Sequence, residues 1–215
     1  MAPKITLYGL ARVPFTEKCR RALVLKSLAF ELREPAGPED FQRWSPKTGL
    51  LPVMTVGDEL VSDSTHILLR LEELCPEPPL LSADPTVAAQ QRHLEDWADE
   101  SFLWYYQEWL RTEPEAAPPA RGALRRVAAR LRVPGRRASL RAELLRGLQD
   151  RLDDLVNFLG ARPFFYSDRI GMADLTVYAM LRSLHMDQIP GAARLLAQRE
   201  ALLAFMRRVE EATGG

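Results

Sequence analysis

Two short motifs, Leu51-Pro52 and Asp63-Ser64, contain the residues of this chain that could bind a small acidic peptide. Pro52 begins a short β-branched run, and a turn with a cis bond at this point would leave the backbone groups of Leu51 available to a ligand. Asp63 and Ser64 stand where a strand ends and an apolar helical pattern begins. The free amides of a helix N-terminus attract a carboxylate, and Asp63 could meet an amino group beside it. The alternative function of Asp63-Ser64 is helix capping alone.

The composition predicts a folded protein without a dominant charge. Its 215 residues are 47% hydrophobic, which is enough to bury the core of one large or two small domains. Equal numbers of basic and acidic residues, 29 each, give no net field that would attract nucleic acid or a membrane. The arginine-rich segment 121–146 has helical spacing and indicates a solvated helix face, with an anionic partner as the alternative. No signal peptide or membrane-length apolar run is found, so we expect a soluble cytoplasmic protein.

Cysteines and histidines are few and widely spaced. Cys19 and Cys75 form no CxxC or metal-binding spacing, which predicts neither a disulfide nor a zinc site and suits a reducing compartment. The histidines, at 66, 93 and 185, are also far apart. We therefore expect no metal site.

The N-terminal third alternates between strand and helix patterns. Strands are expected at 4–8, 29–33, 53–56 and 59–62, and helices at 15–27 and 64–74, with a short irregular helix at 40–44. If the first two strands pair in parallel, their crossover should be right-handed. On the first helix, Cys19 and Leu23 belong to the apolar face, whereas Glu17 and Arg21 fall on the other side.

Clustered prolines between Cys75 and Leu81 mark the best domain boundary. We expect an α/β domain at 1–75, a linker at 76–83 and an all-α domain at 84–215. The helices of the second domain are predicted at 84–111, 120–132, 138–159, 172–185 and 191–212.

Three segments resemble the glutathione transferase family: 13–20 after the first strand, 45–52 before the third, and 63–67 at a helix start. The resemblance covers nearly the whole chain and is nearest the zeta-type transferases and their bacterial relatives. It implies a thioredoxin-like N-terminal domain followed by an all-α C-terminal domain. It also implies a homodimer that conjugates glutathione, as substrate, to an apolar electrophile.

The segment 162–175 resembles the C-terminal signature of that family, whose role there is folding. Asp174 would stand in the first turn of a helix and could reach back to free amides. Gly171 occupies the position where family members usually have serine or threonine, so only one arm of a capping box is expected. Asp174 is therefore predicted to be structural.

The catalytic position is where the chain departs from the family pattern. Members with a Ser-Pro-Phe or Cys-Pro-Phe motif use the residue before proline to stabilise the glutathione thiolate, and here that residue is Val13, which cannot donate a hydrogen bond. Thr16, Tyr8 and Arg12 are the candidate substitutes, although each also has an ordinary role in capping, packing or solvation. The sequence thus predicts either a transferase with another donor or a catalytically silent glutathione-binding or protein-interaction member. A thiol reductase that uses this position is excluded.

The resemblance implies how glutathione would be held. Ser64 would bind the γ-glutamyl carboxylate, Asp63 would support the same end, and Leu51 would pair with the cysteinyl backbone. The candidate glutathione contacts are Phe15, Gln42, Leu51, Pro52, Asp63 and Ser64, with Lys47 as a weaker alternative to Gln42 and solvation as the alternative function of either.

Aromatic residues are concentrated on the first long helix of the predicted second domain. Trp97, Trp104 and, less closely, Tyr105 share one helical face. Trp104 could there border the cleft between the domains and bind the apolar electrophile. Packing between the domains or at a dimer interface is the alternative.

Overall fold

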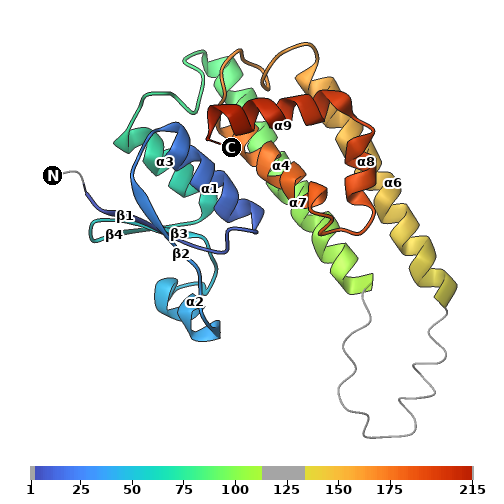
Figure 1. Ribbon diagram of the computed structural model, residues 1–215, viewed down its shortest axis with the longest axis horizontal. Helices are drawn as coiled ribbons and strands as arrows, with labels where there is room; N and C mark the ends of the chain where they lie inside the picture. Colours follow the sequence, from blue (N-terminus) through green and yellow to red (C-terminus); the bar gives the residue numbers. More distant parts are fainter. Residues whose placement is uncertain (1–2, 113–133, 215) are drawn as a thin grey trace, which may run out of the picture.

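The protein consists of a small sheet with helices on both sides, followed by a group of helices (Figure 1). The computed structural model describes residues 3–112 and 134–214. The first part contains β1 (Ile5–Tyr8), α1 (Pro14–Leu25), β2 (Phe30–Arg33), α2 (Pro38–Trp44), β3 (Val53–Val56), β4 (Glu59–Ser62) and α3 (Ser64–Leu74). The second contains α4 (Pro85–Thr112), α6 (Pro134–Leu159), α7 (Met172–His185), α8 (Ala192–Ala197) and α9 (Glu200–Ala212). The helix predicted at 120–132 lies outside the described residues.

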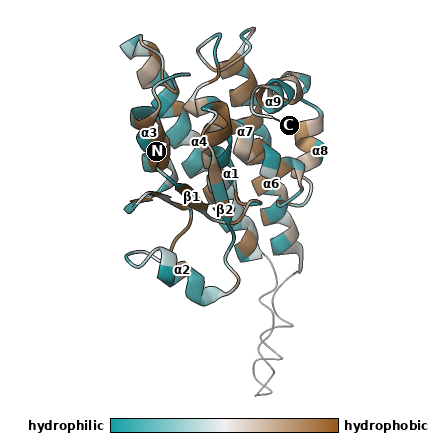
Figure 2. Cartoon of the chain, turned by 60° about the vertical axis from the view of Figure 1, so that its left-hand side comes forward, coloured by the Kyte–Doolittle hydropathy of each residue, from teal (hydrophilic) through white to brown (hydrophobic). Residues whose placement is uncertain are grey.

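The sheet has the strand order β2-β1-β3-β4. Strand β1 pairs in parallel with β2 and antiparallel with β3, which forms a hairpin with β4. In Figures 1 and 2, α1 and α3 stand on one side of the sheet and α2 lies on the other. The predicted βαβ-ββα order is confirmed, as is the fold class of a thioredoxin-like domain followed by an all-α domain. Helix α2 begins at Pro38, earlier than expected, since proline suits the first turn of a helix.

Helix α7 is the central element of the structure. It packs against α1 of the first part and against α4, α8 and α9 of the second. Every residue from Met172 to Leu181 is buried, as expected for a helix that neighbouring elements cover on all sides. None of the helices in the described ranges combines the length and apolar content needed to cross a membrane.

The helix predicted at 191–212 is in fact two helices, α8 and α9, so this prediction was wrong. The backbone leaves helical geometry at Arg199, which has φ −118° and ψ 81°. The Arg199 side chain is buried and binds Asp153 of α6 at 2.8 Å, and it donates to the Leu195 carbonyl oxygen at the end of α8 at 2.6 Å. A tertiary contact thus interrupts a segment whose local pattern is helical throughout.

Candidate functional site

Strand register brings the predicted peptide-binding motifs to the same end of the sheet. Val53, the first residue of β3, lies opposite Tyr8 at the end of β1 and opposite Ser62 at the end of β4. Leu51-Pro52 directly precedes Val53, and Asp63 directly follows Ser62. The cis-proline turn, the start of α3 and the β1–α1 loop are therefore neighbours.

The backbone of Leu51 is available for a ligand. The bond between Leu51 and Pro52 is cis, as the sequence suggested. Among the described residues, neither the N–H nor the C=O group of Leu51 makes a backbone hydrogen bond. They thus have the pairing capacity that an extended peptide requires.

Asp63 caps helix α3. Its carboxylate oxygen Oδ1 accepts hydrogen bonds from the backbone N–H groups of Thr65 at 2.9 Å and His66 at 3.2 Å. Its backbone has φ +77°, a sparsely populated conformation for a residue other than glycine and one found at ligand-binding sites. The capping function is therefore present, whereas contact with a ligand amino group stays a prediction.

Ser64 is the first residue of α3 and retains free hydrogen-bonding capacity. It is mostly buried, but its hydroxyl has no hydrogen bond to any described residue. Its backbone N–H is one of the helix N-terminal amides that Asp63 does not cap. A hydroxyl and an amide at a helix N-terminus form a suitable site for a carboxylate.

Cys19 of α1 lies directly beneath this helix start. Its Sγ is 3.7 Å from the carbonyl oxygen of Ser64, and the residue is fully buried, which confirms the predicted core position. Burial raises the pKa of the Cys19 thiol far above its ordinary value, so the thiol is unreactive at neutral pH. In residues 3–112 and 134–214, no three His, Cys, Asp or Glu side chains are grouped to hold a metal.

A buried charge cluster, the Lys18 cluster, joins α1 and α3 to α4 beside the site. Lys18 Nζ lies 2.6 Å from Glu95 Oε1 and 2.5 Å from Asp99 Oδ2. Glu95 Oε1 also accepts a hydrogen bond from the Thr65 hydroxyl at 2.7 Å. The cluster therefore fixes the helix that carries Ser64 against the second domain. Sequence reasoning missed it, although the i, i+4 spacing of Glu95 and Asp99 on one helix face was a usable signal.

Because the Lys18 cluster holds two carboxyl groups and one ammonium, it should be sensitive to pH. Burial raises the pKa of Asp99 to about 6, above its ordinary value of 3.8, although Lys18 opposes the shift. Between about pH 4 and about pH 6 the folded state therefore binds more protons than the unfolded state. The free energy of unfolding should consequently fall as the pH rises through this range.

We expect Asp99→Asn to remove most of this fall, at most about 3 kcal/mol, because the carboxyl group whose pKa burial raises is then absent. Urea unfolding of both proteins from pH 4 to pH 8 measures the effect. Asp96→Asn, an exposed position on the same helix, is the control and should parallel the native protein. Equal pH dependence of the native protein and Asp99→Asn would contradict the assignment.

The β1–α1 loop places Val13 at the N-cap of α1. The Val13 carbonyl accepts hydrogen bonds from the N–H groups of Thr16 and Glu17, both at 3.0 Å, but its side chain makes no capping bond. Thr16 is fully buried, and its hydroxyl has no partner. That hydroxyl faces Gly9, where a Cβ would overlap it, so the Thr16 side chain points into the fold.

The other candidate residues surround the same loop. The Tyr8 ring packs on Trp44 of α2, with centroids 4.9 Å apart. The Arg12 side chain is exposed, and Phe15 lies 5.9 Å from Lys18 Nζ. These side chains are thus close to Val13 in sequence, and none of them makes a hydrogen bond to another described residue.

Gln42 has a structural role in the loop before β3. Its side-chain amide donates to the Pro46 carbonyl oxygen at 2.7 Å. This bond holds the turn that leads to Leu51, and any contact of Gln42 with glutathione stays a prediction.

Exposed apolar side chains lie on two different sides of α4. Trp104 is 50% exposed and lies about 140° around the helix from Asp99. Leu103, Tyr106 and Leu110 are also exposed, but they lie on the same side as Asp99, which faces the first domain. The helix therefore offers an apolar face toward that domain that the sequence analysis did not single out.

The fold and the sheet-edge site define a class of two-domain proteins, with a thioredoxin-like domain followed by an all-α domain. Residues 7–79 match the family model described as Glutathione S-transferase, N-terminal domain, and residues 136–214 match Glutathione S-transferase, C-terminal domain. The chain therefore belongs to the glutathione transferase family.

Proteins similar to this chain in sequence include zeta-class transferases. The chain is 34% identical over 87 residues to Glutathione S-transferase Z2 of Arabidopsis thaliana, which covers 38% of this chain and 39% of that protein. It is 31% identical over 109 residues to FtsZ-localized protein A of Caulobacter vibrioides, with 47% of each chain covered. The chain thus matches less than half the length of either relative. The Tau class glutathione S-transferase of Mangifera indica shares the fold, with a TM-score of 0.73, 18% identity and coverage of 99% and 93% of the two chains.

Proposed function

We propose that this protein binds glutathione at the sheet edge and conjugates it to an apolar electrophile. The observation that carries the proposal is the uncommitted Ser64 hydroxyl and amide at the N-terminus of α3, beside the unpaired backbone of Leu51. Ser64 binds the γ-glutamyl carboxylate, Asp63 supports the amino group, and Leu51 pairs with the cysteinyl backbone. Phe15, Pro52 and Gln42 complete the proposed contacts.

Replacing Ser64 with alanine tests this proposal. We expect the dissociation constant for glutathione to rise about tenfold, equivalent to about 1.4 kcal/mol, because a hydrogen bond to a charged group is lost. Folding should be unaffected, since the Ser64 hydroxyl has no partner within the described protein. Isothermal titration calorimetry measures the change.

The matched control is Ser62→Ala, an exposed position two residues earlier that should keep native affinity. Absence of glutathione binding by the native protein at millimolar ligand would refute the proposal.

We propose that the electrophile lies against the side of α4 that faces the first domain. Leu103, Tyr106 and Leu110 follow Asp99 along this side of the helix and give it exposed apolar surface. Trp104 remains a candidate contact, but its position on another side of α4 also suits a surface shared by two copies of the chain. We therefore also propose a cytoplasmic homodimer. Sedimentation equilibrium would establish its mass.

The thiolate donor is proposed to be Tyr8, Arg12 or Thr16. Thr16 is the least accessible of the three because its hydroxyl is fully buried. Turnover of glutathione with 1-chloro-2,4-dinitrobenzene, measured in Tyr8→Phe, Arg12→Gln and Thr16→Val, identifies the donor as the residue whose replacement lowers the rate.

A catalytically silent glutathione-binding or protein-interaction member is the second candidate. Val13 favours it because this side chain offers no donor to a thiolate. The similarity to FtsZ-localized protein A, a protein named for its localisation with another protein, also favours it. Glutathione binding without turnover of several electrophiles would support this function.

A further inference from the structure

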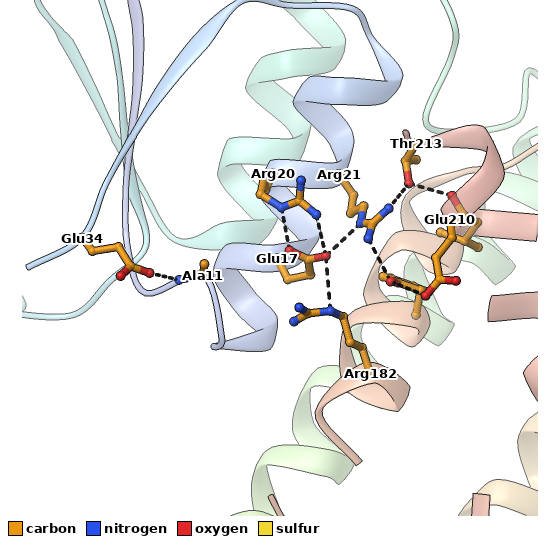
Figure 3. Close-up of polar contacts among 10 residues, drawn as sticks. Ala11, Glu17, Arg20, Arg21, Glu34, Arg182, Glu210 and Thr213 are labelled. Atoms are coloured by element: carbon orange, nitrogen blue, oxygen red, sulfur yellow. Dashed lines mark hydrogen bonds and ion pairs between the residues drawn. The ribbon is translucent and has the colours of Figure 1, made fainter. Parts of the chain in front are cut away.

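A second charge cluster, the Glu17 cluster, lies where α1 meets α7 (Figure 3). The Glu17 carboxylate accepts two hydrogen bonds from Arg20, at 2.7 and 2.9 Å, and one from Arg21 at 2.8 Å. Arg182 of α7 approaches the same carboxylate at 3.8 Å. The Glu17 side chain is only 2% exposed, so three guanidinium groups surround one buried carboxylate.

Arg21 is fully committed to the protein interior. Its remaining nitrogens donate to the Thr213 hydroxyl at 2.7 Å and to the Tyr178 hydroxyl at 2.9 Å. The Tyr178 hydroxyl donates in turn to Glu210 at 3.0 Å. Glu17 is therefore shared by Arg20, Arg21 and Arg182, and Glu210 is connected to Arg21 only through the Tyr178 hydroxyl.

Arg20 and Arg182 therefore carry surplus positive charge. Their side chains are 25% and 32% exposed, and no described carboxylate other than Glu17 pairs with either of them. Burial alone would raise the pKa of Glu17, but hydrogen bonds from Arg20 and Arg21 lower it below the ordinary value. Even with Glu17 ionised, one negative charge faces two partly accessible guanidinium groups.

The geometry of Arg182 leaves its terminal nitrogens available. Its Nε faces Glu17, and in Figure 3 the two terminal nitrogens point away from that carboxylate. Of the other two carboxylates labelled in Figure 3, Glu34 accepts a hydrogen bond from the Ala11 N–H at 2.7 Å and Glu210 accepts one from the Tyr178 hydroxyl at 3.0 Å. A guanidinium edge with two free donors matches the planar shape of an oxyanion.

The β1–α1 loop, which carries Arg12, is held near the end of α7. Gln188, just after α7, donates to the Arg12 carbonyl oxygen at 3.0 Å and so holds the β1–α1 loop against the second domain. The Arg12 side chain is exposed and unpaired among the described residues. The cluster lies on the α7 side of α1, whereas Lys18 and α3 lie on another side.

We propose that Arg20 and Arg182 form an oxyanion site for a small organic carboxylate or phosphate, separate from the glutathione site. Two partly buried guanidinium groups bind such an anion by charge-assisted hydrogen bonds that solvent screens less than at an open surface. The site needs no glutathione and no turnover.

Isothermal titration calorimetry with three probes tests the site. The native protein should bind 3,5-dinitrobenzoate or phenyl phosphate at least tenfold more tightly than uncharged 1,3-dinitrobenzene, and the stronger of the two anions identifies the preferred oxyanion. Saturating glutathione should change the affinity less than twofold. Equal affinity for charged and uncharged probes, or competition by glutathione, would overturn the proposal.

Variants locate the binding. Arg182→Gln should reduce anion affinity about tenfold and leave the uncharged probe unaffected, whereas Arg182→Lys should lose less because it keeps the charge without the fork. Arg207→Gln, an exposed position on α9, removes the same charge elsewhere and should bind normally. Native anion affinity in a folded Arg182→Gln protein would refute the site.

Discussion

Replacement of Asp174 by alanine is expected to lower the free energy of unfolding by about 3 to 5 kcal/mol. Asp174 is completely buried near the start of α7. Its two carboxylate oxygens accept hydrogen bonds from the N–H groups of Phe165 and Gly171, both at 2.8 Å. Alanine would leave both amides buried without a partner, and each costs about 1 to 3 kcal/mol. Chemical denaturation monitored by tryptophan fluorescence measures the loss.

Asp168 provides the matched control for this change. It is an exposed aspartate in the same loop, and Asp168→Ala should alter stability by no more than about 0.5 kcal/mol. If Asp174→Ala yields no folded protein, Asp174→Asn keeps one acceptor oxygen and should give a measurable intermediate loss. Native stability in Asp174→Asn would show that the two hydrogen bonds do not support the fold.

Val13→Ser is expected to raise the catalytic efficiency of glutathione conjugation at least tenfold. Val13 has the extended N-cap conformation, φ −86° and ψ 129°, which serine adopts readily and often stabilises. Its hydroxyl would then stand at the N-terminus of α1, where a donor and the helix dipole together favour a thiolate. The value of kcat/KM with 1-chloro-2,4-dinitrobenzene measures the gain.

The control for this gain is Val13→Ala, which makes the side chain smaller without adding a donor. It should keep the native rate, so that any increase in Val13→Ser reports the hydroxyl rather than extra space. Equal rates in the two variants would mean that bound glutathione does not place its sulfur at this loop. If only Val13→Ser gains activity, the lack of a hydrogen-bond donor at Val13 would also explain a catalytically silent native protein.

Local signals predicted the elements that build the peptide site. Proline before a β-branched run indicated the cis bond at Pro52, and Asp63 before an apolar helical pattern indicated the cap of α3. Both signals depend on residues adjacent in sequence, so they require no knowledge of the packing. The position of Asp174 was accessible for the same reason, because its hydrogen bond to Gly171 spans three residues.

Long-range packing determined what the sequence could not predict. Glu17 and Arg21 read as the polar side of α1, yet both are buried against α7, because that side meets another helix rather than solvent. Lys18 likewise acquires its carboxylate partners from α4, about eighty residues away. The break at Arg199 results from a contact with α6. A polar residue on a helix thus reveals little until the helices beside it are known.

Helix α7 has a consequence for how the protein unfolds. It belongs to the all-α part, but it packs against α1 and bonds to Arg21 through Tyr178. The thioredoxin-like part would therefore expose a large share of α1 if the helical part unfolded first. The two architectural domains should consequently behave as a single cooperative unit, and the linker after α3 should not mark a boundary between independently stable halves.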